Sequence, residues 1–187
     1  MSAGGVDVIL LCEDRQHESF ARRFLKAWNV DGRRIRTILS PPAQGSAEAF
    51  VVRQYPEQLR AFRSRWHGSR DVRLIVIRDA DGRSMHETRA GIESKCGAAG
   101  IDVRGPDEAV GLFVPDRTIE NWIQFVVSGV CDETQRFPKD TGNESRYGNA
   151  ITAFARKCKL RELPERDLFP PSLSAACTEF ETRFLRG

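Results

Sequence analysis

Residues 72–82 have the sequence VRLIVIRDADG, and this stretch decides the fold. Its first part, Val72–Ile77, is an apolar run rich in β-branched side chains, which predicts a strand buried on both faces. Strands of this kind occur in parallel sheets that carry helices on both sides. The run ends in RDADG (residues 78–82), so the predicted strand leads directly into a loop with two carboxylates.

Strands and helices alternate on either side of this stretch. Val6–Cys12, Arg34–Leu39 and Val110–Val114 have the composition of three further strands. The segments between the strands repeat apolar residues at helical spacing. We expect helices from about His17 to Trp28, from Ala47 to Trp66 with a kink or a restart at Pro56, from Ser84 to Cys96, and from Ile119 to Val127. The alternation predicts an α/β fold with a mostly parallel, four-stranded sheet flanked by helices.

The pattern changes after about residue 128. Residues 131–146 are polar with Gly and Pro, while Tyr147–Lys159 and Ser172–Leu185 are predicted helices joined by a proline-containing loop. A chain of 187 residues is long enough for one substantial core with an appendage. We therefore expect one fold unit, with an α/β domain over residues 1–128 and a small helical extension over residues 129–187 packed on it.

The composition is typical of a globular protein, with 40% hydrophobic and 29% charged residues and a net charge of +3. No stretch approaches the ~18 consecutive apolar residues of a membrane span, and the N-terminus lacks the pattern of a signal peptide. Five scattered cysteines without metal-ligand spacing indicate free thiols in a reducing cytoplasm. Only five of the 29 basic residues are lysine. An arginine-rich surface suits a polyanionic partner, although a biased genome composition explains the same excess.

Three carboxylates follow two of the predicted strands. Glu13 comes one residue after the first strand, and Asp79 and Asp81 come two and four residues after the third. The carboxyl ends of parallel strands meet at one edge of the sheet, so we expect these acids to lie close together. Neighbouring carboxylates repel one another unless a hard cation such as Mg²⁺ or Mn²⁺ neutralises them. The competing interpretation of DADG is a solvated turn or a helix cap.

These motifs resemble those of the TOPRIM superfamily, in which a Glu follows the first strand and D-x-D follows a later one. Residues 12–18 (CEDRQHE) are similar to the first motif, residues 79–82 (DADG) to the second, and residues 114–122 (VPDRTIENW) to the third. The closest likeness is to stand-alone TOPRIM-like and OLD-type nuclease proteins of bacterial defence loci. The chain departs from the family pattern at Asp14, where glycine is usual, and at Glu18, which follows Glu13 by five residues instead of four.

The resemblance implies a TOPRIM-like, Rossmann-like sheet. It also implies Mg²⁺- or Mn²⁺-dependent cleavage of phosphodiester bonds in DNA or RNA, with the protein acting as the effector of a bacterial anti-phage defence system. It implies that Asp79 and Asp81 are metal ligands and that Glu13 is a ligand or a general acid or base. Glu18 and Glu120 are candidate further ligands, although an acid in the first turn of a helix also suits the helix dipole.

Basic side chains flank these acids. Arg15, Arg78 and Arg83 are candidates for binding substrate phosphates, or they balance the negative charge. His17 and His86 fall at predicted helix starts, where each is either a proton shuttle or an ordinary polar residue.

Two other functions stay open. In the first, the chain is a catalytically silent sensor or interaction subunit that assembles with an ABC- or SMC-like ATPase or with itself, with Trp122 and Phe125 either on the contact surface or in the core. In the second, it is a haloacid-dehalogenase-like phosphatase, although that family carries D-x-D-G on its first strand and would leave Glu13 without a role. Topoisomerase chemistry is set aside because it needs a nucleophilic tyrosine on a separate domain.

Overall fold

The computed structural model describes residues 6–41, 46–66, 72–138, 147–159 and 168–185. Within them, four parallel strands form one sheet in the order β2-β1-β3-β4. The strands are β1 (Asp7–Cys12), β2 (Ile35–Leu39), β3 (Val72–Ile77) and β4 (Val110–Phe113). This arrangement confirms the predicted α/β fold, and the sheet is parallel throughout.

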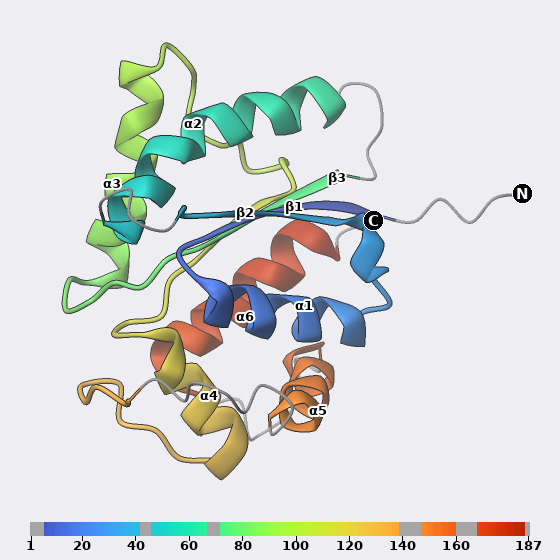
Figure 1. Cartoon of the computed structure of the whole chain (residues 1–187), viewed down its shortest axis with the longest axis vertical. Coiled ribbons are helices and arrows are strands. Elements are labelled where there is room, and N and C mark those ends of the chain that lie inside the picture. The colour runs from blue at the N-terminus through green and yellow to red at the C-terminus, as the bar shows by residue number, and fades with distance from the viewer. Residues whose placement is uncertain (1–5, 42–45, 67–71, 139–146, 160–167, 186–187) are drawn as a thin grey trace, which may run out of the picture.

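Helices cover both faces of the sheet (Figure 1). The side chains of β1 alternate between two cores: Leu10 and its neighbours two residues away pack on one face, and Ile9 and Leu11 pack on the other. On the first face lie α1 (Arg15–Ala27), α4 (Ile119–Ser128), α5 (Gly148–Lys159) and α6 (Pro171–Phe184). On the second lie α2 (Ala47–Trp66) and α3 (Met85–Ala98). Burial on both faces explains why the strands are almost continuously apolar.

Local sequence fixes where the helices begin. Asp14 is the N-cap of α1, and its side chain accepts hydrogen bonds from the amides of Gln16 and His17. Ser84 and Glu87 form a capping box at the start of α3. In contrast, α2 continues through Pro56 without restarting there. Among the described residues, none of the helices combines the length and apolar character needed to cross a bilayer.

The helices after residue 128 complete the core on the α1 face. Phe180 on α6 packs edge-on against Phe24 on α1, with ring centroids 5.0 Å apart. Trp122 is 2% exposed and its indole N–H donates to Ser172 Oγ at 2.7 Å, while Phe125 is 8% exposed. Both aromatic residues therefore belong to the core. They do not form the exposed contact surface that was one of the two alternatives for an interaction subunit. Part of the loop between α5 and α6, residues 160–167, lies outside the described residues.

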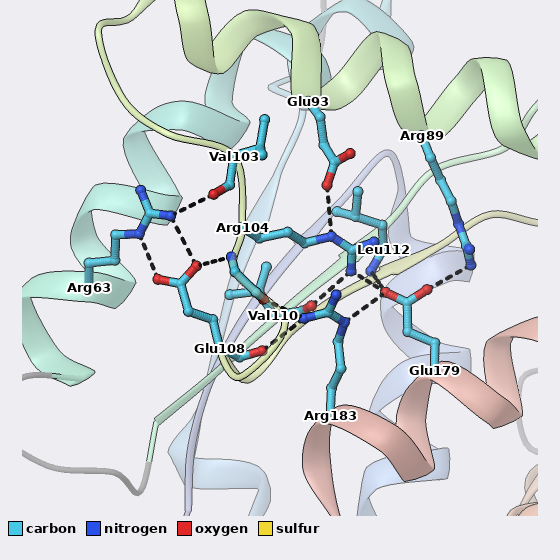
Figure 2. Close-up of polar contacts among 11 residues, drawn as sticks. Arg63, Arg89, Glu93, Val103, Arg104, Glu108, Val110, Leu112, Glu179 and Arg183 are labelled. Carbon is cyan, nitrogen blue, oxygen red and sulfur yellow. Dashed lines mark hydrogen bonds and ion pairs between the residues drawn. The ribbon is translucent and has the colours of Figure 1, made fainter.

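A buried ion-pair network attaches α6 to the edge strand β4 (Figure 2). Glu179 accepts a hydrogen bond from the backbone N–H of Leu112 at 2.8 Å and also contacts Arg89, Arg104 and Arg183. An edge strand with free backbone groups is a template for unwanted pairing. The carboxylate of Glu179, only 9% exposed, therefore caps a backbone N–H of this edge strand and is shared by three guanidinium groups.

The cysteine prediction is wrong in part. Cys158 on α5 and Cys177 on α6 form a disulfide, with Cα atoms 5.5 Å apart. Cys12 and Cys96 are buried free thiols, and Cys131 is a partly exposed one. Sequence spacing did not reveal the pair because the two cysteines meet only after α5 and α6 pack together.

We predict that Glu179→Gln lowers the free energy of unfolding by about 3–5 kcal/mol, the cost of removing one partner from a buried ionic group. Glutamine still accepts from Leu112 but leaves Arg89, Arg104 and Arg183 without their shared anion. Urea denaturation measures the loss. The matched control is Glu93→Gln, whose side chain is 27% exposed and pairs with Arg104 alone, and which should cost clearly less. Equal losses for the two variants would contradict the central role of Glu179.

A second prediction concerns the disulfide. Cys158 and Cys177 are 19 residues apart, and closing a loop of about this size stabilises a fold by ~3 kcal/mol. Addition of a reductant should therefore lower the unfolding free energy of the wild type by about that amount. Alkylation of the denatured, non-reduced protein should modify three thiols. Five modified thiols would show that the bridge does not form.

Candidate metal centre

The strand order reverses between β1 and β3. From β1 the chain crosses to β2 on one side, and from β3 it crosses to β4 on the other. In open parallel sheets, ligands bind outside the carboxyl ends of the strands where the strand order reverses in this way. Cys12 lies opposite Ile77 in the register of β1 and β3, so the loops that follow the two strands leave the sheet side by side.

Glu13, His17 and Asp79 meet at this point of the sheet edge. Each offers one oxygen or nitrogen atom, and the three atoms lie within 4.8 Å of one another. Glu13 follows β1, Asp79 follows β3, and His17 lies in the first turn of α1. The sequence prediction that Glu13 and Asp79 lie at one edge of the sheet is therefore met.

Asp14 determines where His17 points. One of its oxygens, Oδ1, accepts from the backbone amide of His17 at 3.2 Å and contacts the ring nitrogen Nδ1 at 2.8 Å. The other ring nitrogen, Nε2, is 2.9 Å from Asp79 Oδ1. The helix cap therefore also holds the imidazole between two carboxylates, and His17 is 1% exposed.

The loop that carries Asp79 is fixed by its own backbone. The amide of Arg78 donates to Phe113 at 3.2 Å, and that of Ala80 donates to Pro115 at 2.9 Å, so the pairing of β3 with β4 continues beyond the strands. Asp81 then adopts a positive φ of 50°, followed by Gly82 at 93°. Two successive residues with positive φ turn the chain away from the strand direction.

The electrostatics of the cluster are strongly coupled. Burial alone lowers the pKa of His17, but the charge of Asp79 and the hydrogen bonds to Asp14 and Asp79 outweigh it and raise the pKa to about 10. Burial raises the pKa of Glu13 to about 7, which Asp79 reinforces and His17 and Arg78 oppose. Glu13 Oε1 is buried and, among the described residues, has no hydrogen-bond partner. The site therefore contains a carboxylate oxygen with unused acceptor capacity.

The donor set fits a divalent cation. Two carboxylates and one imidazole are ligands that Mn²⁺ and other transition metals accept, whereas Mg²⁺ prefers oxygen alone. A carboxylate on the far nitrogen of a ligating histidine is the usual means of fixing its tautomer and orientation, and Asp14 is in that position. Without a metal, the same contacts form a buried ion pair in which protonated His17 balances Asp14 and Asp79.

Three predicted ligands do not join the cluster. Asp81 is turned toward Arg136, whose Nη2 lies 2.5 Å from Asp81 Oδ1. Glu18 pairs with Arg22 at 2.8 Å on the next turn of α1. Glu120 is buried at 4% exposure in the first turn of α4, outside the group of three. Their positions in the sequence predicted that they lie near the sheet edge. The directions of their side chains, however, depend on partner residues and on local turns of the backbone, which sequence spacing does not specify.

The predicted basic residues occupy different environments. Arg78 is 2% exposed; it contacts Glu48 on α2, and its Nε lies 3.9 Å from Glu13 Oε1. Arg83 pairs with the same oxygen of Glu48 at 3.1 Å. Arg15 is exposed. His86, the other candidate proton shuttle, is exposed at the start of α3.

Sequence reasoning missed two residues of this site. Asp14 was noted only as a departure from a family motif, yet an Asp before a helix with His three residues later is a cap-and-histidine pattern that the sequence contains. Glu48 carried no such signal. It reaches Arg78 across 30 residues of sequence because α2 packs over β1 and β3.

We predict that the stabilising effect of His17 in the metal-free protein disappears at high pH. Its folded pKa of about 10 lies above the ordinary value of 6.5, so the contribution is complete below pH 6.5 and is lost as the pH rises to about 10. Glu13 titrates in the folded state at about pH 7 and adds little further slope above that pH. The stability difference between wild type and His17→Gln should start at roughly 3–5 kcal/mol and shrink between pH 7 and 10.

Urea denaturation in EDTA at several pH values measures this difference. His86→Gln, an exposed histidine replaced in the same way, is the control. If the gap between wild type and His17→Gln is constant up to pH 10, His17 is not held as a buried cation.

Comparison with protein-family models, curated proteins and solved structures gives no significant match. The assignment to the α/β class therefore depends on the parallel sheet and its flanking helices. The TOPRIM-like character of the chain stays a prediction that depends on its motifs.

Proposed function

We propose that the chain binds a divalent cation, Mn²⁺ in preference to Mg²⁺, at Glu13, His17 and Asp79 and hydrolyses phosphodiester bonds in DNA or RNA. The observation that carries the proposal is the convergence of these three side chains at the point where the strand order reverses. The oxygen of Glu13 that lacks a hydrogen-bond partner among the described residues supports it, because a buried acceptor is costly unless something binds it.

In this proposal the two carboxylates and Nε2 of His17 hold the cation, and Asp14 orients the imidazole. A divalent cation at such a site polarises a phosphate and lowers the pKa of bound water. Burial raises the pKa of Glu13 to about 7 in the metal-free site, so a cation that binds there competes with a proton for this carboxyl near neutral pH.

Arg78 is suited to hold a substrate phosphate beside the centre. Its guanidinium group is almost fully buried, is fixed by Glu48 and lies 3.9 Å from Glu13. A guanidinium held in this way binds an anion without losing side-chain entropy and stabilises the charge that develops on it. Arg83, which shares Glu48 but is 63% exposed, would meet the substrate at the rim of the site.

The phosphatase alternative assigns a different role to Asp79. In the structure Asp79 is in contact with His17 and lies beside Glu13. That alternative also gives Glu13 and His17 no part. The arrangement therefore favours a ligand role for Asp79.

Other expectations depend on the resemblance alone. They are a place in anti-phage defence, an ATPase partner or self-assembly, and activity that arises only in the complex. A nucleic-acid substrate suits a cytoplasmic location, while the Cys158–Cys177 disulfide is unusual for that compartment.

Metal binding tests the proposal directly. Asp79→Asn and Glu13→Gln should each lower Mn²⁺ affinity, measured by calorimetry, by more than the ~10–100-fold typical of losing an outer-shell partner. Both variants should also lose Mn²⁺-dependent cleavage of a labelled oligonucleotide. Asp102→Asn, an exposed acid on the loop before β4, is the control and should bind Mn²⁺ like the wild type.

Asp81→Asn distinguishes the two possible ligand sets. The structural cluster omits Asp81, so this variant should keep Mn²⁺ affinity close to that of the wild type. A loss as large as that of Asp79→Asn would favour the ligand set derived from the sequence motif. Wild-type protein that binds no Mn²⁺ would refute the proposal.

A further inference from the structure

An open groove runs between α2 and α3, on the face of the sheet opposite α1. Its cationic lining residues are Arg53 and Arg60 from α2, Lys95 from α3, and Arg78 and Arg83 from the loop after β3. Two carboxylates, Glu48 and Glu57, also line it. Small and aliphatic residues such as Val52, Gly91 and Ala98 form the rest of the lining.

One end of the groove lies at the candidate metal centre. Arg78 lines the groove and is also 3.9 Å from Glu13, while Arg83 and Glu48 lie beside it. The other end is marked by Arg60, which donates to the carbonyl of Ala99 at the end of α3. From Glu48 to Arg60 the helix rises by about 18 Å.

The positive charge of the groove is only partly neutralised from within. Glu48 is shared by Arg78 and Arg83. Arg53 and Lys95 are exposed, and neither forms an ion pair with any of the described residues; the guanidinium of Arg53 lies 5.8 Å from the ring centroid of Phe50. The groove therefore presents unpaired cations along a path that leads to a cluster of carboxylates.

We infer that this groove binds the sugar-phosphate backbone of a single nucleic-acid strand and leads it to the metal centre; the second part rests on the proposed function. A single strand fits better than a duplex. The two helices are in contact with each other, and Leu59 and Ile92 belong to the same core cluster, which implies axes ~8–10 Å apart. A DNA duplex presents two backbones, which are separated by grooves of the duplex about 6 and 12 Å wide. The space between α2 and α3 would take only one of these backbones.

The lining also indicates how the strand is held. Within the described part of the chain, it contains no aromatic side chain on which a base could stack. Binding is therefore electrostatic, independent of base sequence and strongly dependent on salt.

Fluorescence anisotropy of a labelled single-stranded oligonucleotide in EDTA, over a series of salt concentrations, tests the inference without any metal. In Arg53→Gln/Lys95→Gln the slope of log affinity against log salt should become less steep by about 0.7 per residue replaced. The control is Arg156→Gln, an exposed arginine on α5 across the sheet, which should keep the wild-type slope.

The outcomes separate the groove from the metal centre. Equal binding by Arg53→Gln/Lys95→Gln and by Arg156→Gln, or no binding by the wild type, overturns the inference even if the protein cleaves with Mn²⁺. Tighter binding of a duplex of the same sequence overturns the single-strand assignment. Weaker binding by the groove variant, in a wild type that shows no Mn²⁺-dependent cleavage, supports the groove and refutes the nuclease.

Discussion

The parallel register of β1 against β3 is the constraint on which the site depends. Cys12 pairs with Ile77, so Glu13 leaves one strand beside the point where Asp79 leaves the other. The register is enforced from both sides, because β1 and β3 send alternate residues into two separate cores. A slip by one residue would exchange the two sets of side chains and would also move the acids apart. The packing of the core and the geometry of the site are thus fixed by the same pairing.

Charge balance around the site is local and tight. Burial and the charge of Asp79 disfavour the ionisation of Glu13, and His17 and Arg78 oppose that effect. Both compensating groups are held by a second acid, Asp14 for His17 and Glu48 for Arg78. The site is therefore preorganised: each cation has its position set by a residue that is not itself in the group of three. Because the side chains are already in position, the site can bind an anion or a cation without reorganising them.

Much of this architecture follows from the sequence, and the exceptions have identifiable causes. Apolar runs and turn residues predicted each strand, and the rule that ligands bind at the carboxyl ends of parallel strands placed Glu13 and Asp79 together. The direction of Asp81 was not predictable, since it depends on a positive φ and on Arg136, which is 55 residues away. Glu48 and the Cys158–Cys177 bridge likewise depend on how helices pack, which periodicity does not specify. The metal-ligand role, the substrate and the partners are not decided by the fold, because one α/β sheet can carry many different chemistries.

The network around Glu179 has a consequence for biosynthesis. Leu112 and Glu179 are 67 residues apart, so the edge of β4 stays uncovered on the ribosome until α6 has been made. At ~5–20 residues per second this delay lasts several seconds. During that interval the nascent sheet exposes an unprotected edge together with Arg89 and Arg104, which still lack the carboxylate of Glu179, and this makes the emerging chain a natural client for a chaperone.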